Sequence, residues 1–312
     1  MTVVSASLRA RSGVFAISGG AILWGTTGVV AHAVHARTGL SAVSIAFYRT
    51  FTAALVLAVV RGPAIARLIR TARRGRLGVL ALAGASLGVS QALYFVAAAD
   101  AGVSLATLIC IGVAPVAVTC ASSIARRRMP SAGPLATLGC ALLALVLITT
   151  STSSATGPHP LAGVLAALGS GLAYATSTVL SGRLAGTADP LTLTGATSIV
   201  GSLTLAPAAL VSGVGFPVDD VSMAALFYLG VVTTVLAYGL FFGGLRTTSA
   251  EVAAVLTLLE PLGATVLAVS LLGETLTGLG LLGAVLLLAA VGALLARRPE
   301  TPVESGAPMT PY

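Results

Sequence analysis

The sequence is poor in charge and contains no lysine. Charged residues make up 8% of its 312 positions, against about 25% in soluble globular proteins, and the mean hydropathy is +1.02. The chain contains many long apolar stretches, and a soluble core of 312 residues could not bury them all. The composition therefore excludes a soluble domain. Without lysine there is no GxxxxGK[ST] sequence, and this excludes a primary pump built around that nucleotide-binding loop.

Cysteine and histidine are also scarce. The three cysteines, Cys110, Cys120 and Cys140, have no cysteine or histidine partner nearby in the sequence. Neither a disulfide framework nor a metal site is therefore predicted. The three histidines fall in or beside loops, and neither an HExxH motif nor a pair of aspartates within a predicted span occurs. We expect no metal, no cofactor and no enzyme, which disfavours a membrane-embedded enzyme as an alternative.

The chain is instead rich in apolar segments of membrane-spanning length. Each is about 20 residues long, enough for a helix to cross about 30 Å of hydrocarbon. We expect an all-α integral membrane protein with ten transmembrane helices. Their predicted ranges are 13–34, 41–60, 77–98, 103–124, 133–151, 160–181, 190–211, 221–243, 250–271 and 277–296.

The positions of the seventeen arginines predict the orientation. If the chain starts inside, fifteen face the cytoplasm, Arg37 lies outside and Arg49 lies within a span. We therefore expect a multi-pass protein of the cell (inner or plasma) membrane, with a cytoplasmic N-terminus at 1–12 and a cytoplasmic, disordered tail at 297–312. Six arginines lie in the one sizeable predicted loop, 61–76. The net charge of +8 is spread over alternate loops, which indicates anionic lipid and not nucleic acid as its partner.

The two halves of the chain resemble each other in spacing and hydropathy. Residues 93–115 can be laid over 239–261, since both stretches place an aromatic residue before a short break and end on a proline. The first span likewise matches the sixth, with Trp24 opposite Tyr174.

This similarity predicts two five-helix repeats, 13–151 and 160–296. Five is an odd number, so the second repeat must be inverted relative to the first. Inverted repeats provide two nearly equivalent conformations, which is typical of alternating-access carriers. A duplication without functional meaning is the alternative.

Two charged residues lie near the middle of predicted spans, where a charge costs roughly 2.5–3.5 kcal/mol. Arg49 could clamp carbonyls or a carboxylate, bind an anionic group of a substrate, or snorkel towards the surface. Glu260 could carry a proton, bind a substrate amine, or make a structural hydrogen bond. Pro261 lacks an N–H group, so we expect the carbonyl of Thr257 to lose its helical partner and the helix to hinge there, as at Pro115.

Polar side chains also follow one face of several spans. Gln91 and Tyr94 share a face of the third span, and the sixth span carries a longer stripe. Such stripes either hydrogen-bond between helices or line a common cavity, and the sequence leaves both open. The stripe of the sixth span comprises Ser170, Tyr174, Ser177, Thr178 and Ser181.

Three segments resemble a known family: LWGTTGVV at 23–30, FYRTFTAAL at 47–55, and above all LLEPLGATVLAVSLLGETLT at 258–277. The chain is similar to the drug/metabolite transporter superfamily, specifically its ten-helix EamA-type exporters, over about residues 12–297. The first half departs from this pattern at 124–130, where IARRRMP replaces the Gly-Glu that the family often shows.

The resemblance implies a secondary carrier that exports small metabolites, such as amino acids or related and toxic compounds, without a cofactor. It places a central cavity among spans 3, 4, 8 and 9, with 5 and 10 outermost. Proton coupling through Glu260 is one expectation; a channel or a lipid flippase remains an alternative, and a homodimer remains open. The candidate substrate-binding residues are Trp24, Arg49, Gln91, Tyr94, Tyr174, Tyr238 and Glu260.

The predicted orientation can be tested by labelling. Single cysteines placed in 61–76 should resist a membrane-impermeant thiol reagent in intact cells, because that segment is expected inside. Cysteines placed at 152–159 should react. Labelling of 61–76 from outside would contradict the topology.

Overall fold

The computed structural model describes residues 3–101, 103–127, 132–150, 159–215, 219–272 and 278–296, and within these ranges every regular element is a helix. The predicted all-α class is therefore confirmed. In chain order the elements are α1 (Val3–Thr38), α2 (Ala42–Thr71), α3 (Arg74–Ala101), α4 (Val103–Arg126), α5 (Ala132–Thr150), α6 (Pro160–Leu184), α7 (Pro190–Ser212), α8 (Asp220–Gly230), η1 (Val231–Leu236), α9 (Ala237–Gly244), α10 (Ala250–Leu256), α11 (Leu259–Leu272) and α12 (Gly278–Ala296).

These helices coincide with the predicted apolar segments. Seven of the described segments are long and apolar enough to cross a membrane, counting α8, η1 and α9 as one. Two shorter apolar helices, Leu135–Ile148 and Gly278–Ala293, accompany them. Large apolar side chains remain exposed on the outside of the bundle, such as Val211 at 91% and Val59 at 78%. Hydrocarbon would cover such faces, whereas water would not tolerate so many of them.

The 61–76 segment is not a loop, so that expectation is wrong. Helix α2 continues to Thr71 and α3 begins at Arg74. The stretch is rich in arginine and alanine, which favour helix. Pro63 lies inside α2 and is tolerated there. Because charge ends a membrane span but not a helix, hydropathy alone marked the wrong boundary.

The expected unpaired carbonyl at Thr257 is also wrong. A turn at Thr257–Leu258 divides the ninth predicted span into α10 and α11. The Glu260 N–H donates to the Thr257 carbonyl at 3.0 Å, in place of the group that Pro261 lacks. Pro261 falls in the first turn of α11, where a missing N–H leaves nothing unpaired.

The eighth predicted span contains a π-helical segment that the sequence did not predict. Residues Val231–Leu236 form η1 between α8 and α9. The hydroxyls of Thr233 and Thr234 both donate to the Leu229 carbonyl, at 2.7 and 3.0 Å. Short π segments inside α-helices are frequent at functional sites.

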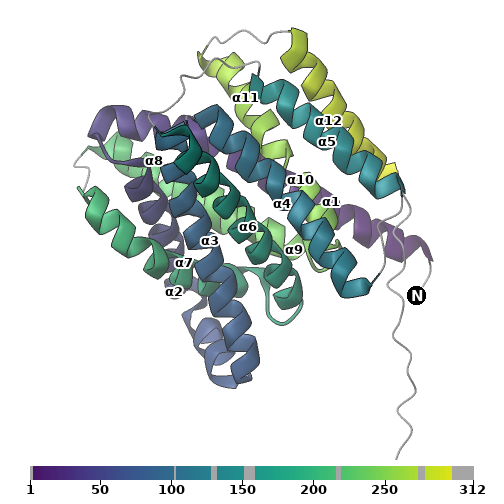
Figure 1. The fold of residues 1–312 in the computed structure, drawn as a ribbon. Helices are drawn as coiled ribbons and strands as arrows, with labels where there is room; N and C mark the ends of the chain where they lie inside the picture. The colour runs from purple at the N-terminus through teal and green to yellow at the C-terminus, as the bar shows by residue number, and fades with distance from the viewer. Residues whose placement is uncertain are drawn as a thin grey trace, which may run out of the picture.

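The helices pack in a recurring set of pairs. Helix α6 packs on α3 and α4, while α1 packs on α8, α9 and α11. Helix α2 packs on α7, and α5 on α12. In Figure 1, α5 and α12 lie side by side along one edge of the bundle, away from α2 and α7.

Glycines allow several of these helices to approach closely. A side chain on Gly163 would meet the backbone of Ala101, and one on Gly171 would meet the carbonyl of Cys110. Gly25 lies equally close to the carbonyl of Glu260. These small residues therefore pack helices within the chain.

Candidate functional site

Two adjoining cavities lie between the central helices and share Leu87, Thr197 and Tyr238. In each of them about 10 Å³ is open to the centre of a water-sized sphere, which is roughly the room for one water molecule. The polar lining of the first is Arg49, Thr50, Gln91, Thr197, Ser198, Thr234 and Tyr238. The polar and aromatic lining of the second is Tyr174, Ser177, Thr178, Ser181, Thr197, Tyr238, Phe241 and Phe242.

Arg49 is the charged residue of this lining, and helix α2 holds it at the cavity with only 8% of its surface exposed. Its Nε is buried without a hydrogen-bond partner, and the two ion pairs between described residues involve other arginines. Burying a guanidinium N–H group without a hydrogen-bond partner is costly. An anionic group in the cavity would remove that cost.

The threonine hydroxyls around Arg49 are turned to their own helices. Thr50 and Thr197 each donate to the carbonyl one turn earlier, at 2.8 and 2.9 Å, and Thr234 donates to that of Leu229. Because their hydrogens are used, these hydroxyls can offer only lone pairs to a molecule in the cavity. The Arg49 guanidinium therefore offers hydrogen-bond donors to the cavity, and the three threonine hydroxyls beside it offer acceptors.

An aromatic cluster supports the cavity from one side. The ring centroid of Trp24 lies 4.7 Å from that of Tyr238 and 5.6 Å from that of Phe241. Trp24 is 5% exposed and is absent from the lining of both cavities. Trp24 therefore packs against the Tyr238 ring without lining a cavity itself.

Glu260 and Tyr94 lie apart from the lining of either cavity. Glu260 interacts electrostatically with Arg49, Tyr94, Cys110 and Tyr174, but no ion pair within 4.0 Å joins it to Arg49. The Tyr94 hydroxyl hydrogen-bonds to Thr107 at 2.8 Å instead. The two intramembrane charges therefore occupy neighbouring but separate places.

Of the seven predicted candidates, the structure brings four together around the cavities: Arg49, Gln91, Tyr174 and Tyr238. The predicted stripe of α6 divides. Its C-terminal part, including Ser177 and Ser181, lines a cavity. Ser170, at its N-terminal end, hydrogen-bonds to Ser90 and Cys110 instead.

Sequence reasoning missed the contribution of α7. Thr197, Ser198 and Gly201 line a cavity. The signal was present, because small and polar residues recur three and four positions apart along the LTLTGATSIVG segment at 191–201.

One short motif also required the structure for its interpretation. Gly84 to Gly88 spells GxSxG around Ser86. In hydrolases that pattern needs a sharp strand-to-helix turn. Here it lies inside the continuous helix α3, so it forms no nucleophile elbow.

Comparison with known proteins adds a second line of evidence. The sequence model of the EamA-like transporter family matches residues 11–150 and again 161–296. The chain belongs to this family. It is also 25% identical over 284 residues to the uncharacterized inner membrane transporter YicL of Salmonella typhimurium, covering 90% of this chain and 94% of that protein. The uncharacterized transporter YwfM of Bacillus subtilis is 28% identical over 273 residues, covering 86% and 88%.

The fold of this family member also matches a solved crystal structure with a TM-score of 0.75 and 18% identity, over 96% of this chain and 99% of the other. That likeness concerns the fold alone. Family membership and the apolar helices together identify a multi-pass membrane transporter, and a transporter of this family takes a small-molecule substrate.

The position of Arg49 generates a prediction. Arg49→Leu should lower transport by at least about ten-fold, because a charge-assisted contact contributes roughly 1.5–3 kcal/mol. Arg49→Lys should restore little, since the planar fork of donors is lost. Transport is measured in proteoliposomes and folding by thermal melting, with the exposed Arg246→Leu as a control. Wild-type rates in both Arg49 variants would remove this residue from the site.

Proposed function

We propose that this EamA-family transporter is a ten-span secondary carrier that exports a small metabolite by alternating access. The observation that carries the proposal is the pairing of the helices. In the two halves, 13–151 and 160–296, α1 corresponds to α6, α3 to α8–α9, and α4 to α10–α11. Helix α1 packs on α8, α9 and α11, and its counterpart α6 packs on the corresponding helices α3 and α4. The pairs α2–α7 and α5–α12 exchange into themselves. Halves related in this way can adopt two equivalent arrangements, one open to each side.

Single-residue contacts support the same exchange. The overlay that pairs Trp24 with Tyr174 also pairs Gly13 with Gly163. The overlay that pairs Pro115 with Pro261 pairs Ala101 with Thr247. Gly163 lies against Ala101, and Gly13 lies against Thr247.

A second pair of contacts behaves alike. Gly25 lies against Glu260 and Ala264, and their counterparts are Ala175, Ala114 and Val118, which pack in one cluster. These relations favour inverted repeats over chance similarity. If α10 and α11 count as one interrupted span, they complete ten with the seven long and two shorter apolar helices.

The residues that line the cavities support a proposal for how the substrate is bound. Arg49 would bind an anionic group, and Gln91, Tyr174 and Tyr238 would bind the rest of a small metabolite such as an amino acid. This assignment rests on the buried Nε of Arg49, which has no hydrogen-bond partner, and on the hydroxyl acceptors beside it.

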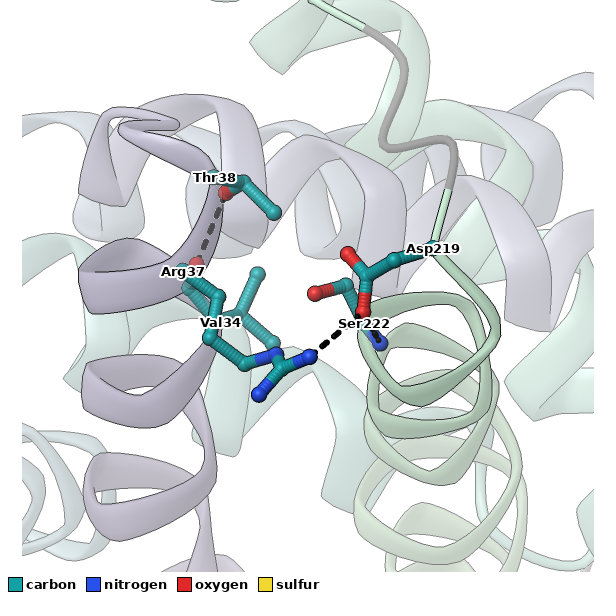
Figure 2. A network of polar contacts seen from close by, with 5 residues as sticks. All are labelled: Val34, Arg37, Thr38, Asp219 and Ser222. Atoms are coloured by element: carbon teal, nitrogen blue, oxygen red, sulfur yellow. Dashed lines mark hydrogen bonds and ion pairs between the residues drawn. The ribbon is translucent and has the colours of Figure 1, made fainter.

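Two ion pairs join the halves at opposite ends of the bundle. Arg37, near the end of α1, lies 3.2 Å from Asp219, directly before α8 (Figure 2). Arg61 lies on α2, about 28 Å along the helix axis from its first residue, Ala42. It pairs with Asp189 at 3.8 Å. Exposed pairs of this kind are weak, so each can break in turn as its end opens.

Both acids are fixed by the helices that they cap. Asp219 accepts from the Ser222 N–H and Asp189 from the Thr192 N–H, both at 3.0 Å. Partial burial acts to raise the pKa of Asp189, but hydrogen bonds from the Thr192 hydroxyl and N–H, with the Arg61 charge, hold it below its ordinary value. Asp189 is therefore ionised at neutral pH and available to Arg61.

Neutralising the two acids should shift the carrier in opposite directions. Asp219→Asn should open the Arg37 end and Asp189→Asn the Arg61 end. Asparagine still caps a helix, so only the charge is lost. Because an exposed pair contributes about 0.2–1 kcal/mol, the shift should be roughly 1.4- to 5-fold.

The measurement is labelling of a single cysteine at position 91 by an impermeant thiol reagent, from either side of sealed vesicles, with Cys110, Cys120 and Cys140 replaced by alanine. The double variant should regain the wild-type balance. The control, Asp220→Asn, removes a neighbouring acid outside the two ion pairs. Shifts in the same direction for both variants would refute alternating access through these ends.

We assign Glu260 to proton coupling, because it lies outside the cavity lining while interacting electrostatically with Arg49 and Tyr174. The counterpart in the first half is Ala114, so a single carboxyl would carry the proton. The rival role, binding a substrate amine, would require Glu260 to face the cavity.

Glu260→Gln should therefore uncouple transport from a pH gradient while substrate exchange survives. The amide mimics the protonated acid and cannot release a proton. Net transport driven by an imposed gradient and exchange without one are measured in proteoliposomes, with Glu251→Gln as the control on the same span. Transport that still follows the gradient at the normal rate would leave Glu260 with a packing role.

A further inference from the structure

The ends of α2 and α3 project beyond the apolar part of the bundle. Helices of 30 and 28 residues are about 45 and 42 Å long, whereas hydrocarbon is about 30 Å thick. The apolar stretch of α2 ends near residue 60 and that of α3 begins near 77. In Figure 1 the joined ends extend at the lower side of the bundle. We call residues 61–76 the arginine hairpin.

The arginine hairpin carries a concentrated positive charge. It holds six arginines and no acid. Arg61 is paired with Asp189, and the other five are exposed and form none of the ion pairs recorded between described residues. Those five are Arg67, Arg70, Arg73, Arg74 and Arg76.

Helical structure makes this charge a surface of fixed shape. Only residues 72 and 73 separate the two helices, and Ile65 is buried at 4% exposure, which holds the end of α2 against the bundle. A positively charged loop would have to lose conformational freedom on binding a partner. The backbone of the arginine hairpin is already ordered as helix, so binding would cost it less conformational entropy.

We propose that the arginine hairpin binds the phosphate groups of anionic phospholipids in the leaflet that it borders. The hairpin leaves the apolar spans at Arg61 and Arg76, which is the level of the headgroups, and along α2 its tip lies about 15 Å beyond Arg61. A guanidinium can pair with two phosphate oxygens at once, and clusters of basic residues beside a span attract anionic lipid. The inference is independent of the substrate, the coupling ion and the side of the membrane on which the hairpin lies.

The test compares two double variants that lose the same charge. Arg67→Gln/Arg76→Gln removes, from each helix of the hairpin, the exposed arginine that lies nearest to its apolar span. The control, Arg183→Gln/Arg246→Gln, removes two exposed arginines that stand alone at other helix ends. Each protein is reconstituted in vesicles of phosphatidylcholine and phosphatidylglycerol and released for native mass spectrometry, which counts the lipids retained.

Wild type and the control should retain phosphatidylglycerol in preference to phosphatidylcholine. The hairpin variant should lose that preference by at least about five-fold, the factor that one basic residue contributes near an anionic surface, and added salt should act in the same direction. Thermal melting checks that all three proteins are folded.

Three results would overturn the proposal. They are a wild type without lipid preference, a hairpin variant that keeps it, and a control that loses it equally. Binding of soluble heparin by the wild type, without any preference among lipids, would assign the hairpin to a soluble polyanion instead.

Discussion

Hydrocarbon offers no hydrogen-bonding partner to a peptide group, and the architecture follows from that constraint. Every described element is helical, since a helix pairs its own backbone. Where the helix is interrupted, nearby groups replace the missing bonds: the Glu260 N–H serves the Thr257 carbonyl, and two threonine hydroxyls serve Leu229. The interruptions in the described residues thus occur where such groups exist, and one of them, η1, lies beside a cavity through Thr234.

Hydropathy predicted most helix boundaries within a few residues, because burial in lipid depends on composition over a long window. The start of α1 is an exception, since the helix begins at Val3 and not at the predicted residue 13. Hydropathy failed at 61–76, where charge ended the span but not the helix. It also missed η1 and the turn before Leu259. Both depend on individual hydrogen bonds, to which an average over twenty residues is insensitive.

The site was predictable where a residue was out of place in lipid. Arg49 stands out in any apolar span, and the structure places it at a cavity. Trp24 and Tyr94 were less predictable, because an aromatic side chain fits equally well in a lining or behind it. Thr197 and Ser198 were overlooked because hydroxyls are common in spans, and only the packing of α7 against α2 and α3 shows which of them meet the cavity.

The π segment determines which way the following helix faces. One additional residue in a turn rotates everything beyond it by about 100° around the helix axis. Tyr238 lies just past η1, so its phenol reaches both cavities only while the wide turn persists. If η1 reverted to a regular α-helix, Tyr238 would swing to another face of the span. The orientation of this aromatic ring therefore depends on how Thr233 and Thr234 hold the Leu229 carbonyl, some distance from the ring itself.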